Sequence, residues 1–448
     1  MTTASYLFIT VWLLALWYHW RKFGSHISVS SLLFALVILL HGIPLLVYLH
    51  ITGPDTYIYE AALSGVDREE VQSELLLAMS LMYAFLIVGS ELAQLIFPKW
   101  HRQGIQEGRA RKGMPLYRTY MWTAKSYNML WVIVVLMLTV SVYQSQLVKV
   151  YSYFASGGSE FEKIALRRES GGSSFYLYNV FLYSVAPFLV MVVYSANLNG
   201  RIVRGGKFLF LALFTATLLG KLGTLSKAPP VIFLLQMMFF WVLLKRQQFN
   251  FSIIAGSIMS VLVLFVVMVS ITMPELDLNA VLQFLYYRMF DIPNEALLEF
   301  FAAIPASIPH GWGAGLFGFM DWFLDKPALP MYFAVAEVTR GSIESSSNVM
   351  FVGDAWAQFS WGGVVIFSLL SGFIVRAIDL YAFRHGHSVE SACLVAGCSF
   401  GVFTMLSTSL TTALITGGLV LLPLLSALFP KQRTSRIPNR LAPTSSIG

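Results

Sequence analysis

Long hydrophobic runs alternate with short polar turns along almost the whole chain, and most runs approach the length that a helix needs to cross a bilayer. Short alternating strands are missing from the pattern, which therefore predicts an all-α polytopic integral membrane protein rather than a β-barrel. We expect about eleven transmembrane helices, and these lie near Tyr6–Trp20, Ser28–Ile51, Glu74–Phe97, Tyr127–Val148, Phe175–Leu198, Phe208–Leu225, Pro229–Leu244, Ser252–Met273, Ala355–Ile378, Ser391–Ser407 and Leu410–Leu428. Residues 1–430 are expected to form one transmembrane domain, and residues 431–448 a disordered tail.

One long polar segment, residues 274–350, interrupts this pattern between the eighth and ninth predicted spans. Asp277 can cap a helix that begins at Leu278, and Pro293 interrupts that helix and starts a second one, which carries Glu295. Both helices suit the membrane interface. A membrane protein that folds so large a segment outside the bilayer usually uses it to handle a ligand there.

Charge predicts the orientation of the chain. Only 12% of the residues are charged, and most lysines and arginines fall in one set of loops, including the basic segment Lys99–Lys125. By the positive-inside rule these loops, and the C-terminus, face the cytoplasm, so residues 274–350 face outward. The net charge of +7 is then explained by the anionic inner leaflet, and no nucleic-acid partner is expected.

Several kinds of chemistry are disfavoured by what the sequence contains. The two cysteines, Cys393 and Cys398, lie in one apolar span, and no His/Cys/Asp group has the spacing of metal ligands, so we expect no metal and no cofactor. The sequence also contains no nucleophile elbow, P-loop or zinc-protease motif.

Cationic side chains recur at the predicted outer face. Arg167 and Arg168 follow a glycine-rich stretch, Lys227 lies in a short turn, and Lys221 falls inside an apolar span. Such cations suit an anionic ligand, because guanidinium matches phosphate oxygens in a bidentate way. The alternatives are pairing with nearby glutamates, contact with lipid headgroups and, for Lys221, extension of the ammonium toward the interface.

The long segment adds Arg288 and Arg340 to these cations. It also holds a Pro/Gly-rich stretch with His310 and Trp312, followed by further aromatic residues. Aromatic faces suit sugar rings and the aromatic belt at a membrane interface equally well. A histidine in such a turn is either an exposed residue or a proton-transfer group.

The order of these features resembles the Wzy family of oligosaccharide repeat-unit (O-antigen) polymerases. The resemblance covers about residues 150–380 and rests on the Arg167-Arg168 segment, the turn that ends at Lys227, and an arginine in the first helix of the large loop, within Tyr287-Arg288. Two positions depart from the family pattern. Lys227 stands where the family often has arginine, and Ser360 stands where a glycine is common.

The resemblance implies a function. Wzy polymerases join sugar repeat units on polyprenyl (undecaprenyl) pyrophosphate at the periplasmic face of the bacterial inner membrane, and a GT-C-like glycosyltransferase architecture and a chain-length-regulating co-polymerase are implied with it. The cations, with Tyr287 and Trp312, would bind the substrate, and Arg288 would stabilise the pyrophosphate leaving group. The candidates for the group that takes the acceptor's proton are His310, Glu295, Asp291 and Asp354, of which we favour His310.

The sequence leaves three alternative functions open. An O-antigen ligase would use the same donor with a different acceptor, a lipid-linked oligosaccharide flippase would translocate single units, and a membrane scaffold would have no such chemistry. Loss of a polymerase leaves glycans one repeat long, loss of a ligase leaves polymer on the carrier lipid, and loss of a flippase leaves single units inside the cell.

Overall fold

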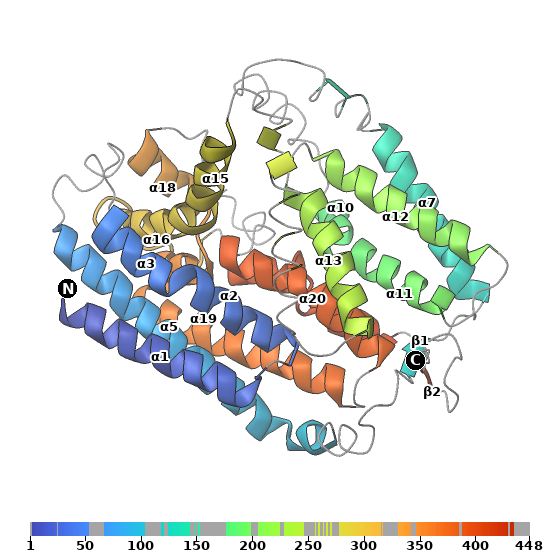
Figure 1. Cartoon of the computed structure of the whole chain (residues 1–448), viewed down its shortest axis with the longest axis horizontal. Helices are drawn as coiled ribbons and strands as arrows, with labels where there is room; N and C mark the ends of the chain where they lie inside the picture. Colours follow the sequence, from blue (N-terminus) through green and yellow to red (C-terminus); the bar gives the residue numbers. More distant parts are fainter. Residues whose placement is uncertain are drawn as a thin grey trace, which may run out of the picture. The chain divides into compact units, whose positions relative to one another are not determined.

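The computed structural model of the protein is built almost entirely of helices (Figure 1). The structure describes residues 2–24, 26–52, 67–103, 118–120, 124–143, 148, 151–152, 176–198, 205–224, 228–245, 256, 259, 263, 266–267, 269–270, 277–314, 316, 330–341, 346–384, 388–428 and 431–433. One short antiparallel pairing, between β1 (Arg118–Tyr120) and β2 (Lys431–Arg433), is the sheet structure in these residues. β2 thus occupies the first three residues of the expected disordered tail.

Five candidate membrane spans occur in the described residues, by length and apolar composition. They are Val29–Thr52, Arg68–Ile96, Tyr176–Asn197, Phe351–Phe383 and Val389–Ser407. Two shorter apolar helices cover Tyr127–Tyr143 and Ala228–Leu244. The chain is therefore an α-helical, multi-pass membrane protein, while the predicted total of eleven spans stays a prediction. The predicted span Ser252–Met273 lies largely outside the described residues.

The eleventh predicted span, Leu410–Leu428, is not one helix. It is divided into α21 (Leu410–Ile415) and α22 (Leu421–Leu428). Gly418 lies between them with φ +81°, a backbone conformation that glycine adopts without steric cost. Hydropathy alone could not show this break, because the glycine pair there leaves the run apolar.

The chain divides into two compact units. The single transmembrane domain over residues 1–430 stays a prediction. Unit 1 comprises Met1–Pro98, Pro274–Asp379 and Val402–Leu414. Unit 2 comprises Lys99–Met273, Leu380–Gly401 and Ile415–Gly448.

Unit 1 is a helical bundle in which α1, α2, α5 and α19 run side by side (Figure 1). Its elements, with π-helical turns labelled η, are α1 (Thr3–Lys22), α2 (Val29–His41), α3 (Ile43–Val47), η1 (Tyr48–Thr52), α5 (Arg68–Ile96), α15 (Leu278–Tyr286), η3 (Tyr287–Asp291), α16 (Ile292–Ala303), α18 (Met331–Arg340), α19 (Phe351–Phe383) and α21. A Cβ at Gly89 would overlap the carbonyl of Leu369, and one at Gly372 the carbonyl of Leu86. Glycines therefore allow α5 and α19 to approach closely, as small residues do between membrane helices.

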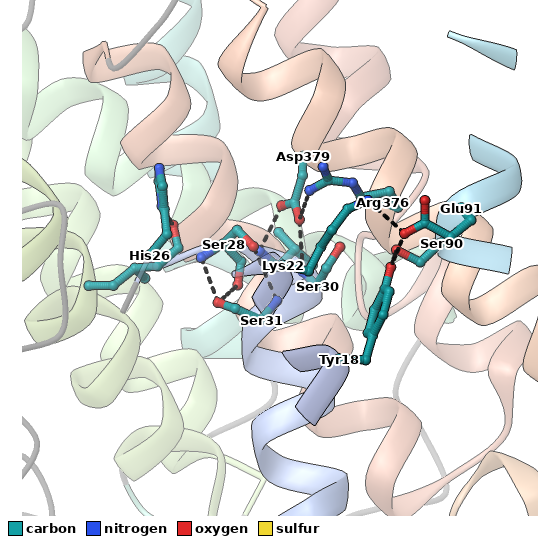
Figure 2. A network of polar contacts seen from close by, with 12 residues as sticks. Tyr18, Lys22, His26, Ser28, Ser30, Ser31, Ser90, Glu91, Arg376 and Asp379 are labelled. Atoms are coloured by element: carbon teal, nitrogen blue, oxygen red, sulfur yellow. Dashed lines mark hydrogen bonds and ion pairs between the residues drawn. The ribbon is translucent and has the colours of Figure 1, made fainter. Parts of the chain in front are cut away.

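A polar network ties one end of this bundle together (Figure 2). Asp379, which is buried, accepts the backbone N–H groups of Val29 (2.8 Å) and Ser30 (3.1 Å) at the start of α2. Figure 2 shows its carboxylate between Arg376 and the Ser28–Ser31 turn, and the Arg376 Nη1 to Asp379 Oδ2 distance is 3.9 Å. A carboxylate here satisfies helix N–H groups that would otherwise lack acceptors, so Asp379 joins α19 to α2.

Unit 2 is built around α11. Its elements are α7 (Ala124–Tyr143), α10 (Tyr176–Val180), η2 (Phe181–Val185), α11 (Ala186–Leu198), α12 (Gly206–Leu222), α13 (Ala228–Lys245), α22 and most of α20 (Val389–Ser407), together with β1 and β2. α11 and α12 pack against each other, and α12 also packs against α7. Their core contains Leu189, Leu213 and Phe233, all almost fully buried.

The long segment folds as predicted at its start and differs further on. Asp277 caps α15, its Oδ1 accepting the N–H of Ala280 at 2.7 Å, and α15 begins at Leu278. The second helix, α16, begins at Ile292, beside Pro293. Every residue from Asn294 to Ala303 is buried, so α16 belongs to the core of unit 1 and is not an amphipathic helix on a surface.

Candidate functional site

Two buried glutamates lie one helical turn apart on α16. Glu295 is 4% exposed and Glu299 is 2% exposed. Residues four apart share one face of an α-helix, and both α18 and α5 pack against α16. Burying two carboxylates is costly unless each is paired or protonated, so their partners indicate what the site can do.

Glu299 is an ion-paired carboxylate. Arg340, in the last turn of α18, donates from Nε to Oε1 at 2.9 Å and from Nη2 to Oε2 at 3.0 Å, and the hydroxyl of Ser347 also donates to Oε2. This bidentate geometry is the strongest common form of a charged hydrogen bond. The sequence predicted Arg340 as a substrate-binding residue, and the structure commits two of its donors to Glu299. Glu299 itself was not predicted, although its spacing from Glu295 was a signal for it.

Glu295 is held in a different way. The hydroxyl of Tyr287 donates to Glu295 Oε2 at 3.1 Å. Burial raises the pKa of Glu295, and the negative charge of Glu299 raises it further. Burial, followed by the charge of Glu295, raises the pKa of Tyr287 to about 12. The two carboxylates on this helix face thereby differ, because Glu299 is ion-paired with Arg340 and Glu295 keeps its proton to higher pH, an arrangement suited to acid–base work.

Arg288 follows Tyr287 in the π-helical turn η3 and is exposed. Its guanidinium lies 5.1 Å from the centroid of the Phe284 ring and forms no ion pair with another residue in the described part of the chain. Its charge acts on Tyr287, because it lowers the pKa of that hydroxyl against the larger effects of burial and Glu295. π-Helical turns are often found at functional sites. Beside the Tyr287–Glu295 pair, η3 therefore presents a cation that is not ion-paired with any other described residue.

A second group of polar contacts is built on a break in α19. Phe359 (φ −136°, ψ 19°) and Ser360 (φ 54°, ψ −144°) are not helical. The segment His310–Gly313 lies against this break. Gly311 and Trp312 donate their backbone N–H groups to the carbonyls of Ala357 and Gln358, both at 2.9 Å. Backbone groups that the break removes from the helix are thus satisfied by a loop, as buried backbone requires.

The side chain of Gln358 completes this attachment. Its Oε1 accepts the N–H of Gly313 at 3.0 Å, and its Nε2 donates to the carbonyl of Ala314 at 3.1 Å. A Cβ at Gly311 would lie 2.7 Å from Gln358 Oε1, so only glycine fits there without displacement. Gly313 has φ +94°, which also favours glycine. The loop is therefore fixed in place.

Ser360 occupies a backbone conformation in which an L-residue is strained. Its φ of +54° is of the kind that glycine adopts readily. Glycine would fit this conformation better than the serine that the chain has here.

His310 is oriented by the same break. Its Nδ1 lies 3.0 Å from the carbonyl oxygen of Trp356, and a carbonyl can only accept, so Nδ1 carries the proton. In the neutral ring Nε2 then has the lone pair, and no described residue bonds to it. The imidazole also lies perpendicular to the Trp356 ring, at 5.4 Å between centroids. A backbone acceptor that fixes the tautomer is what a general base needs.

α16 connects the two groups. Phe301 stacks on Trp356 with centroids 4.6 Å apart, and Trp356 Nε1 donates to the carbonyl of Ile304 at 3.0 Å. Phe301 follows Glu295 by six residues, which is about 9 Å along an α-helix. The Glu295 group and the His310 group therefore belong to one continuous structure within unit 1.

Two further predicted residues, Asp354 and Asp291, lie in unit 1. Asp354, in the first turn of α19, is half-buried, and its Oδ2 has no hydrogen-bond partner among the described residues. Asp291 ends η3 and is half-buried. Arg167, Arg168 and Lys227 lie outside the described residues, so the predicted gathering of cations around one ligand stays a prediction.

Lys221, the last predicted cation, belongs to unit 2 and is fully buried near the end of α12. Its Nζ lies 4.6, 5.3 and 5.9 Å from the ring centroids of Tyr183, Phe400 and Phe233, and it has no hydrogen-bond partner in the described part of the chain. Aromatic faces attract a cation. Lys221 and the three rings all belong to unit 2.

The described residues contain no group of three or more His, Cys, Asp or Glu that could hold a metal ion. Comparison with protein-family models, curated proteins and solved structures finds no match for this chain.

Proposed function

We propose that this protein is a metal-independent glycosyltransferase that polymerises polyprenyl-pyrophosphate-linked oligosaccharide repeat units. The proposal is supported by two groups in one unit of a membrane protein. The first is the guanidinium of Arg288, which has no ion-pair partner among the described residues, and the second is a histidine whose Nδ1–H is fixed by a backbone carbonyl. The first suits a diphosphate leaving group and the second suits an attacking hydroxyl.

The reaction follows from these two groups. The oxygen of an acceptor sugar hydroxyl attacks the anomeric carbon of the donor glycan, and its proton passes to Nε2 of His310. The bond between that carbon and the pyrophosphate oxygen breaks, and the electron pair leaves with the polyprenyl pyrophosphate. Arg288 stabilises this developing charge. The ion pair of Glu299 with Arg340 supports Glu295 and Tyr287 beside it.

The location of the reaction follows from the charge pattern. With the basic loops and the C-terminus in the cytoplasm of a bacterium, the segment 274–350 faces the periplasm from the inner membrane. The lipid tails of donor and acceptor would lie in the bilayer, and a chain-length-regulating co-polymerase is the expected protein partner. O-antigen or a related surface polysaccharide is the expected product.

The test is elongation of lipid-linked oligosaccharides by the purified protein in nanodiscs, with products separated by length. A ladder of polymers is expected for the wild type. Arg288→Ala should lower the rate about 100-fold or more, because one donor to a developing charge is worth about that much, and Arg288→Lys should also be impaired if bidentate contact matters. Arg68→Ala, an exposed cation at the start of α5, is the matched control and should elongate normally.

His310→Ala tests the base and should lower the rate by about 100-fold or more at neutral pH. Normal chain lengths from Arg288→Ala would reject the assignment of the leaving-group site. Transfer of finished polymer to a different acceptor, with no elongation, would instead identify a ligase.

A further inference from the structure

Trp312 combines two features that rarely occur together. Its backbone has φ +46°, and its side chain is 70% exposed. A bulky residue with positive φ is an outlier, and its backbone is strained. Ordinary turns place glycine or asparagine at such a position. The strain therefore brings no gain in buried area and needs another explanation.

The surrounding contacts fix this conformation. The N–H of Trp312 is bonded to the Gln358 carbonyl, and the next residue, Gly313, is bonded to the Gln358 side chain. The indole lies roughly perpendicular to the rings of His310 (6.1 Å) and Phe359 (6.4 Å). Within the described part of the chain no aromatic ring stacks flat on it. A rigid and mostly uncovered aromatic face thus lies beside His310.

We propose that Trp312 is a stacking platform for the terminal sugar of the acceptor, which it holds next to Nε2 of His310. The C–H face of a pyranose packs on an aromatic ring, and the hydroxyls at the edge of that sugar then face the imidazole. The role as acceptor site rests on the proposed function, whereas binding of a sugar to Trp312 does not.

A membrane-interface anchor is the competing role for an exposed tryptophan. An anchor needs only an amphipathic ring at the right depth, and a flexible backbone serves it equally well. It does not require a strained residue held by hydrogen bonds on both sides, nor a histidine with a fixed tautomer next to it. Preorganisation of this kind is typical of a binding site.

The binding test uses saturation-transfer NMR on the purified protein in a detergent without sugar groups. The probes are the methyl β-glycosides of glucose, galactose and N-acetylglucosamine. Transfer to the sugar C–H protons is expected for the wild type and for Trp312→Phe, and it should be lost in Trp312→Leu. Leucine keeps the apolar character that an anchor needs and removes the ring. Trp20→Leu, which replaces a tryptophan that is 73% exposed in α1, is the matched control and should keep the signal.

Equal transfer to the wild type and to Trp312→Leu would overturn the proposal. A kinetic measurement separates it from the proposed function. If both hold, Trp312→Leu raises KM for the acceptor by about 2- to 10-fold, the range expected for one aromatic contact, with little change in KM for the donor. Sugar binding at Trp312 without any elongation would reject the polymerase and keep the platform. Elongation by Trp312→Leu with an unchanged KM for the acceptor would keep the polymerase and reject Trp312 as the platform for its acceptor.

Discussion

Two buried charged residues, Glu299 in unit 1 and Lys221 in unit 2, are accommodated in opposite ways. Glu299 receives two hydrogen bonds from Arg340 and one from Ser347. Lys221 is as deeply buried, yet among the described residues its amine has no hydrogen-bond partner and lies near the rings of Tyr183, Phe400 and Phe233. A buried ion keeps its charge only if its surroundings replace the water that it has lost.

The difference indicates different uses. A fully paired carboxylate fixes geometry, because removing either partner leaves an uncompensated charge. It therefore acts as a framework for Glu295, Tyr287 and Arg288. The Lys221 amine has no oxygen partner among the described residues, so it contributes little to holding the fold together and its replacement should cost little.

The largest effect is expected from Arg340→Ala. Of the described partners of the buried Glu299 carboxylate it leaves the Ser347 hydroxyl, and breaking a buried pair on one side costs about 3–5 kcal/mol. The free energy of unfolding, measured by SDS titration in mixed micelles, should fall by this amount.

Lys22→Ala is the control for this prediction. It removes a more exposed pair, in which Lys22 Nζ lies 2.7 Å from Glu91 Oε1 with side chains 27% and 43% exposed. Surface pairs are worth about 0–1 kcal/mol. Equal losses in the two variants would show that the Glu299–Arg340 pair is not the framework of the site.

Lys221→Met tests the other side of the comparison. Methionine fills a similar volume with an apolar, flexible chain that aromatic rings accept well. It also removes a buried amine that has no hydrogen-bond partner among the residues that the structure describes, so the free energy of unfolding should rise by about 1–3 kcal/mol. Lys221→Gln, which keeps a polar end, should lack this gain. A loss of stability in Lys221→Met would mean that the attraction of the three rings for the cation exceeds its cost of burial.

The sequence predicted much of the helical framework, for identifiable reasons. Asp277 was a correct cap because a carboxylate followed by apolar residues at helical spacing is a local signal. The burial of α16 was not predicted, because Glu295 among apolar residues made the helix look like an amphipathic surface helix. Glu299 was not predicted either, and its partners Arg340 and Ser347 lie 41 and 48 residues away from it, a distance at which sequence spacing carries no information.

The sequence suggested the residues of the candidate site, but it did not predict the contacts between them. Arg288, Tyr287, Glu295, His310 and Trp312 were all expected from residue type and from their place in an outer segment. The break in α19 that orients His310 was not, because hydropathy is continuous across Phe359 and Ser360. Only backbone geometry reveals why a Pro/Gly-rich stretch sits against a membrane helix.

A smaller effect is expected at that break. Ser360→Gly relieves a positive φ, and the free energy of unfolding should rise by about 1 kcal/mol. Ser360→Ala keeps the Cβ and should give no such gain. If both variants have the stability of the wild type, the break in α19 is not strained at this residue, and the hydrogen-bonded loop alone explains it.

The smallest and most specific effect concerns Glu295, which is buried like Glu299 without a bidentate cation of its own. Tyr287, Glu299, Arg340 and Asp291 are the titratable groups that act on it. Below its ordinary pKa of 4.5 the carboxyl is protonated in both the folded and the unfolded protein. As the pH rises, the unfolded chain ionises first, so the folded state loses stability until the pH exceeds the raised pKa.

The variant Glu295→Gln cannot ionise at this position, so its free energy of unfolding should depend less on pH in this window. Titration of both proteins from about pH 4 to pH 8 checks this. Identical slopes would mean that Glu295 ionises as readily as it does in the unfolded chain, and that α16 carries two carboxylates of the same kind.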